Sequence, residues 1–242
     1  MSNKKVWRLP LLLLLALLLI LAMLRLGVWQ LSKASEKQSI LDSRLLASQQ
    51  ASVSVESLGK LNESQRFTPV FARGRYLSSK TLYLDNQVFN KQVGYQVITP
   101  FVLESTGGLI LVTRGWVPAG ASRDQLPKVA SPKGVQRLEG RLNLPAAAPP
   151  LWDDKYSVYE GARWQYLDMQ ELDARYEAAL HSLVLELHPD YEGDADLMRA
   201  WNDINDQWVA KHNAYALQWF SMAAAFFIAC LILLLRRSKN ER

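Results

Sequence analysis

The stretch YALQWFSMAAAFFIACLILLL, Tyr215–Leu235, contains 21 residues and no charged side chain. A helix rises 1.5 Å per residue, so this length matches the roughly 30 Å hydrocarbon core of a bilayer. The polar sequence RRSKNER follows it directly. We therefore predict a transmembrane helix over residues 212–235.

A second apolar block, Leu9–Leu24, lies near the other end of the chain, and it reaches membrane-spanning length if it continues past Arg25 to Leu31. Arg25 then lies near one end of the segment, where its long side chain can carry its charge to the interface. A cleaved signal peptide is the alternative, but Arg25 separates the block from the loosely matching cleavage site Ser32-Lys33-Ala34. We predict an uncleaved transmembrane helix over residues 9–31.

The net charge of +5 comes from the two ends of the chain. The tails, residues 1–8 and 236–242, have a net charge of +6, whereas residues 32–211 have a net charge of −2. Nucleic acid is therefore excluded as a leading partner, because it requires a basic patch on the folded part. Basic flanks mark the cytoplasmic side of a membrane, so we expect both tails in the cytoplasm and residues 32–211 on the far side. No Arg/Ser-rich leader is present, which favours a bacterial inner membrane and a periplasmic domain.

Composition and motifs argue against several classes of protein. One cysteine excludes a disulfide-built scaffold, and one cysteine with three scattered histidines argues against a four-ligand zinc site. The sequence contains no G-x-S-x-G, H-E-x-x-H or C-x-x-C motif and no Gly-rich phosphate loop. The adjacent carboxylates Asp153-Asp154 lie in a Pro-flanked loop and are typical of a solvated surface. We predict that the protein is not an enzyme.

Residues 32–211 are predicted to form a β-rich domain. Residues 34–58 lack Gly and Pro, which favours a helix that continues out of the membrane. β-Prone runs then predict strands at Phe67–Leu77, Thr81–Val88, Tyr95–Leu103, Leu109–Trp116, Val135–Leu144 and His181–Leu187, with a helix at Asp168–Leu180. Turn-forming residues predict breaks at Asp85-Asn86, Gly107-Gly108, Pro118–Gly120 and Ser131–Gly134. The predicted fold class is membrane α+β, with two transmembrane helices bracketing an antiparallel, barrel-like periplasmic domain.

One face of the second predicted membrane helix carries candidate ligand-binding residues. His212, Tyr215, Ala216 and Trp219 are spaced i, i+3, i+4 and i+7, so they share a face at the outer mouth of the helix. An imidazole there is suited to ligate a haem iron, and the aromatic neighbours are suited to cover the macrocycle. The alternative is a polar flank within an aromatic belt at the interface, and the pattern alone favours that alternative.

Two further motifs have a structural and a functional interpretation. Arg114-Gly115-Trp116 ends a predicted strand; it is either a partner-binding patch or a bulge in which Trp packs on the barrel and Arg pairs with a carboxylate. The pattern favours the bulge. His188-Pro189-Asp190 repeats the tripeptide of J-domain co-chaperones, but an apolar, β-prone segment precedes it, which favours a turn after a strand.

Five segments, in order along the chain, together resemble the Surfeit locus protein 1 family, the assembly factors of cytochrome c oxidase. The segments are LGVWQLSKASEKQ (Leu26–Gln38), TPF (Thr99–Phe101), LVTRGWVP (Leu111–Pro118), RWQYLD (Arg163–Asp168) and HNAYALQWF (His212–Phe220). The first is similar to the signature L-G-x-W-Q-L-x-R, with Lys33 at the last position, and the third to L-V-N-R-G-[WF]-V-P, with Thr113 in place of Asn. Only residues 186–211 align with nothing in the family pattern.

The resemblance implies a membrane-anchored, non-catalytic factor that helps insert haem a into oxidase subunit I or stabilises that subunit. It implies His212 as the transient iron ligand, with Tyr215 and Trp219 on the same face, and haem a synthase as a further partner. Two alternatives stay open. One is a scaffold that contacts oxidase subunits, for example through Arg114–Trp116, without binding haem. The other is a membrane-tethered enzyme.

Overall fold

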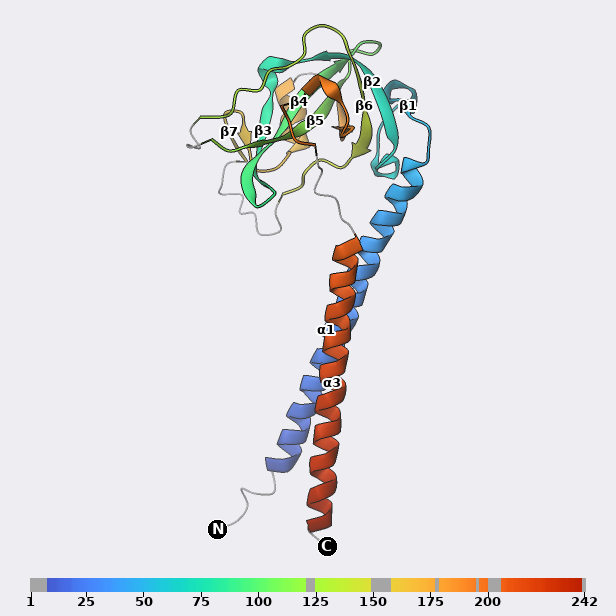
Figure 1. Cartoon of the computed structure of the whole chain (residues 1–242), viewed down its shortest axis with the longest axis vertical. Helices are drawn as coiled ribbons and strands as arrows, with labels where there is room; N and C mark the ends of the chain where they lie inside the picture. Colours follow the sequence, from blue (N-terminus) through green and yellow to red (C-terminus); the bar gives the residue numbers. More distant parts are fainter. Residues whose placement is uncertain are drawn as a thin grey trace. The chain divides into compact units, whose positions relative to one another are not determined.

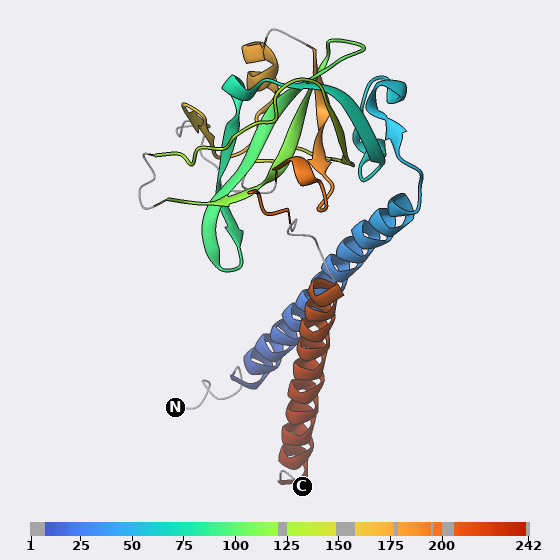
Figure 2. The ribbon, with the colours of Figure 1, turned by 45° about the horizontal axis from the view of Figure 1, so that its top comes forward.

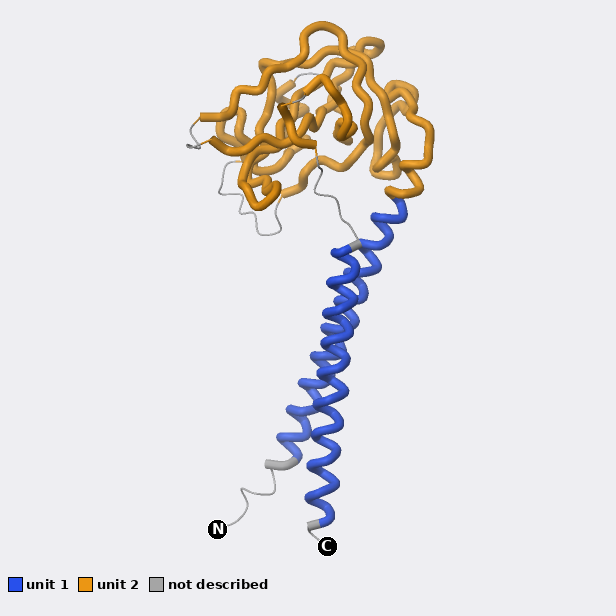
Figure 3. Tube along the Cα trace, in the orientation of Figure 1, with its two compact units in different colours: residues 1–43, 204–242 blue, residues 44–203 orange. Residues whose placement is uncertain are grey.

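The computed structural model describes residues 8–120, 125–148, 158–176, 179–194, 196–199 and 206–240. The chain divides into two compact units, which Figure 3 colours separately. Unit 1 comprises residues 1–43 and 204–242 and contains two long helices (Figure 1). Unit 2 comprises residues 44–203 and contains the β-sheet.

The helices of unit 1 are α1 (Arg8–Ser48) and α3 (Asp206–Asn240), and both are long and apolar enough to cross a membrane. Side chains such as Leu12 and Leu233 on these helices are more than 60% exposed. Rows of exposed leucine are costly in water but suit contact with lipid. The proposed membrane boundaries, 9–31 and 212–235, stay predictions.

Helix α1 ends ten residues before the predicted helix end at residue 58. After Ser48 the chain forms strand β1 (Val53–Ser54), parallel to β2 (Pro69–Tyr76), and then a 3-10 turn over Val55–Leu58. Val55 is fully buried in the core of unit 2. Valine at positions 53 and 55 favours extended structure, and the burial of Val55 outweighs continuation of the helix.

Five strands of unit 2 close into a barrel in the order β2-β6-β9-β5-β4, with β4 pairing back onto β2. The other four are β4 (Gln92–Leu103), β5 (Leu109–Pro118), β6 (Gln136–Asn143) and β9 (Leu180–Leu187). Gly74 marks the closing point, because it pairs with Gln136 of β6 and with Leu103 of β4. A Cβ atom on Gly74 would lie 1.9 Å from the carbonyl oxygen of Val102, so closure requires glycine there.

The sheet is mixed, not purely antiparallel as the sequence predicts. Strand β9 lies between β5 and β6, parallel to the first and antiparallel to the second. Strands β5 and β9 are separated in the chain by β6 and by the connection that contains helix α2 (Met169–Tyr176), and a connection of that length permits parallel pairing. The six long strands, which are the five of the barrel and β3 (Leu82–Phe89), otherwise lie where the sequence predicts strands.

Asp85-Asn86 is not the predicted turn. Both residues lie within β3, and the pairing of β3 with β4 shifts register between Leu84 and Gln87, which is a bulge. Asn86 has φ 58°, and its backbone N–H donates to the Asp85 carboxylate at 2.7 Å. The turn follows at Asn90-Lys91, where φ is 47° and 64°, as in a two-residue hairpin.

Apolar clusters pack inside the barrel and against its outer face. The largest one fills the barrel with side chains of all five strands, among them Val70, Phe101, Val112, Leu138 and Leu185. The second packs α2 and the short hairpin β7 (Tyr159–Glu160) and β8 (Arg163–Trp164) against the outer face. Trp164, from the RWQYLD segment, is fully buried in this second cluster.

Candidate functional site

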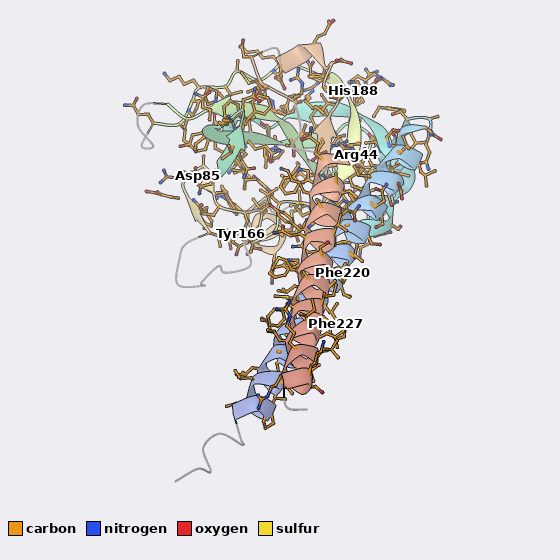
Figure 4. All side chains as sticks on the ribbon, turned by 60° about the horizontal axis from the view of Figure 1, so that its bottom comes forward. Arg44, Asp85, Tyr166, His188, Phe220 and Phe227 are labelled. Carbon is orange, nitrogen blue, oxygen red and sulfur yellow. The ribbon has the colours of Figure 1, made fainter. Side chains whose placement is uncertain are left out.

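Helices α1 and α3 approach each other through small residues. Gly27 and Ala34 of α1 are buried, as are Ala216 and Ala223 of α3. A Cβ atom on Gly27 would lie 2.6 Å from the ring of Phe220, which Figure 4 labels on α3. Small residues at a contact between membrane helices let the two backbones come close.

His212 lies on the face of α3 that meets α1. Its Nδ1 atom is 2.7 Å from Oε1 of Gln30, and the imidazole is half-buried. An amide oxygen only accepts, so a hydrogen bond to Oε1 places the proton on Nδ1, and this tautomer has its electron pair on Nε2. A histidine fixed in this way is prepared to bind a metal ion through Nε2.

The aromatic residues near His212 differ in exposure. Trp219 is half-buried, whereas Tyr215 is 52% exposed. Trp208, one turn before His212, is exposed, and the Lys211 ammonium lies 5.7 Å from the centre of its ring. The structure therefore brings together His212 and Gln30. The spacing in the sequence could not reveal Gln30, because it lies on the other helix.

Arg114-Gly115-Trp116 lies inside unit 2. Arg114 has no exposed surface and Trp116 is 7% exposed. The pairing of β4 with β5 shifts register at Arg114, so the bulge interpretation is confirmed. A partner-binding role stays a prediction that this burial does not favour, because a partner cannot reach side chains within the fold.

The Arg114 guanidinium is fully hydrogen bonded. It forms a bidentate ion pair with Asp194, with Nε donating to Oδ2 at 2.9 Å and Nη2 donating to Oδ1. It also donates to Ser131 Oγ at 2.8 Å and to the carbonyl oxygen of Ala130 at 2.6 Å. Its Cζ lies 5.0 Å from the centre of the Tyr76 ring, and burial together with the Asp194 carboxylate raises the pKa of Tyr76.

A second buried arginine, Arg199, holds the segment that follows β9. It donates to the carbonyl oxygens of Asp194 at 2.9 Å and Pro189 at 3.2 Å. The two arginines fix this segment against β5. His188-Pro189-Asp190 is a turn after β9, as predicted, with the Tyr191 N–H donating to the His188 carbonyl at 3.0 Å.

No group of three or more His, Cys, Asp or Glu side chains suited to a metal ion occurs within the described ranges. Asp153-Asp154 lies outside those ranges. Since haem iron is held by its porphyrin, one protein histidine suffices as an axial ligand. The site around His212 is therefore the candidate functional site, with the imidazole as its one ligand.

A family model described as the SURF1 family matches residues 17–224 of the chain. A SURF1-like protein of Rickettsia felis is 26% identical over 221 residues, covering 87% of this chain and 91% of that protein. A SURF1-like protein of Monosiga brevicollis is 24% identical, covering 89% and 84%. The protein named Surfeit locus protein 1 of Takifugu rubripes is 24% identical, covering 61% and 67%.

Proposed function

Because the chain belongs to the SURF1 family, we propose that it is a membrane-anchored, non-catalytic assembly factor of cytochrome c oxidase. In this proposal, α1 and α3 span a bacterial inner membrane and unit 2 lies in the periplasm. The family is generally associated with assembly of this oxidase. Two helices of sufficient length and apolarity, with basic residues at both chain ends, support the membrane part.

We further propose that the protein holds haem a through His212 before transfer to oxidase subunit I, with haem a synthase as a partner. The pair of His212 and Gln30 carries this part, because it leaves Nε2 available as an axial ligand. Haem a has a charged propionate edge and a long apolar tail. A site at the end of a membrane helix lets the tail lie in lipid and the propionates near water. A single histidine ligand suits reversible binding.

The haem proposal predicts a spectrum that depends on His212. The full-length protein, purified in detergent from cells that also synthesise haem a, is expected to show a haem a absorption band. His212→Ala should reduce haem per protein to background, because the iron loses its axial ligand. Gln30→Leu should weaken haem affinity about tenfold, because the ring loses the hydrogen bond that orients it.

His188→Ala is the matched control, since His188 is an exposed histidine in unit 2. It should leave the band unchanged. Equal haem content in wild type and His212→Ala would exclude His212 as the ligand. Absence of haem from both, despite sufficient synthesis, would favour a scaffold that contacts oxidase subunits without the cofactor.

The topology is tested separately. Reporter fusions at residue 1 and residue 242 should both give a cytoplasmic signal, because the basic residues of the two tails resist translocation. A fusion inserted at Gly107, in the turn between β4 and β5, should give the opposite signal. An outward-facing C-terminus would contradict the two-helix topology.

A further inference from the structure

The hairpin of β3 and β4 carries exposed apolar side chains at its tip. Val88 and Val93 are directly opposite in the pairing, so they share a face, and they are 49% and 43% exposed. The tip extends past the end of β5, whose last pair with β4 is Gly94 with Pro118. Figure 2 shows the hairpin, in green, projecting from the barrel.

The other face of the tip is fixed to the barrel through Trp116. The centres of the Phe89 and Trp116 rings are 5.4 Å apart, and the indole N–H donates to the Gln87 carbonyl at 2.9 Å. A Cβ atom on Gly94 would lie 2.4 Å from the same indole, so the ring packs flat against the hairpin. The part of the hairpin that carries the two valines is therefore held in place by its contacts with Trp116.

The tip of the hairpin differs in charge from the rest of the domain. Residues 86–103 contain one basic residue, Lys91 in the turn, and no Asp or Glu, and Asp85, the one carboxylate of the two strands, lies before the tip and is buried. Residues 32–211 as a whole have a net charge of −2. An apolar tip that carries a lysine and no carboxylate is suited to the interface of a bilayer that contains anionic lipids.

The tip is also close in the fold to the point where the chain leaves unit 2. Trp116 and Met198 exchange two backbone hydrogen bonds, of 2.7 and 2.9 Å, and Met198 is itself 50% exposed. From Arg199 the chain reaches the first residue of α3, Asp206, in seven residues. Seven residues span at most about 25 Å, so a membrane-spanning α3 keeps Arg199 within that distance of the helix end.

We propose that the β3–β4 tip rests on the outer surface of the bilayer, with Val88 and Val93 at the boundary of headgroups and acyl chains. The contact would attach unit 2 to the membrane directly, in addition to its two chain connections to α1 and α3. The inference rests on the membrane anchoring in the proposed function, and not on haem binding.

Spin labels on single cysteines test the contact in the full-length protein. The background is Cys230→Ser, and the labelled variants are Val88→Cys and Val93→Cys, in nanodiscs of phosphatidylcholine with phosphatidylglycerol. Molecular oxygen concentrates in lipid and a soluble nickel complex in water. We expect labels at 88 and 93 to collide more with oxygen, and Lys91→Glu to shift both towards nickel.

Ser105→Cys is the matched control, because Ser105 is exposed in the turn at the opposite end of β4. Its label should collide more with nickel. Labels at 88 and 93 that behave like the label at 105 would overturn the proposal, because the tip would then lie in water. A label on the native Cys230 tests the membrane anchor itself. If this label collides more with oxygen while the labels at 88 and 93 collide more with nickel, only the tip contact is refuted. If the label at Cys230 collides more with nickel, both the anchor and the tip contact are refuted.

Discussion

Asp194→Ala is expected to lower the free energy of unfolding of unit 2 by about 3–5 kcal/mol, because it leaves the buried charge of Arg114 without its counter-ion. Arg114 has no exposed surface, and the Asp194 side chain is 2% exposed, so water cannot replace the lost partner. The loss also releases the segment over residues 189–199 that Arg199 holds. Urea unfolding of the full-length protein in detergent, followed by tryptophan fluorescence, measures the change.

Asp196→Ala is the control for this experiment. Asp196 is two residues away and exposed, so its removal should change the unfolding free energy by less than about 0.5 kcal/mol. The double variant Arg114→Met, Asp194→Leu should recover part of the stability, since apolar residues of similar size often replace a buried ion pair with little loss. A double variant as unstable as Asp194→Ala would show that other hydrogen bonds of Arg114, not its unpaired charge, set the cost.

The regular elements of the fold could be predicted because their signals are local. Uncharged runs predict the helices, and β-prone runs bounded by Gly and Pro predict the long strands. Asp85-Asn86 shows where local signals fail. Both are common in turns, but here they form a bulge, because pairing with β4 continues on either side. The true turn, Asn90-Lys91, carries no glycine or proline to mark it.

Long-range contacts explain the other differences. Asp194 lies 80 residues from Arg114, and Gln30 lies 182 residues from His212, so no pattern in either segment identifies the partner. The parallel pairing of β9 with β5 likewise depends on distant segments, because β9 fills the position between β5 and β6 in the barrel. The sequence supplied the histidine of the candidate site, and only the packing of the two helices supplied the residue that orients it.

Gly115→Glu is expected to lower the free energy of unfolding of unit 2 by about 4 kcal/mol or more. Backbone strain, a close contact of the new Cβ atom and burial of the carboxylate all contribute. Gly115 has φ 152°, a backbone conformation that residues with a side chain rarely adopt. A Cβ atom there would lie 2.7 Å from Leu197 Cβ and 3.0 Å from the Met198 carbonyl oxygen, both in the segment held by Arg199. The glutamate would also bring a carboxylate between the buried residues Arg114 and Trp116, where water cannot solvate it.

Gly107→Glu separates these effects, because Gly107 has a positive φ of 68° but no atom within 4 Å of a Cβ. Backbone strain alone should cost about 1–2 kcal/mol there. Gly115→Ala adds a close contact without a charge and should fall between the two glutamate variants. Protease resistance and urea unfolding of the full-length protein measure the order. If Gly115→Glu were no less stable than Gly107→Glu, the contact of β5 with Leu197 and Met198 would not be part of the folded protein. The pairing of Trp116 with Met198, which the proposal for the hairpin tip uses, would then lose its support.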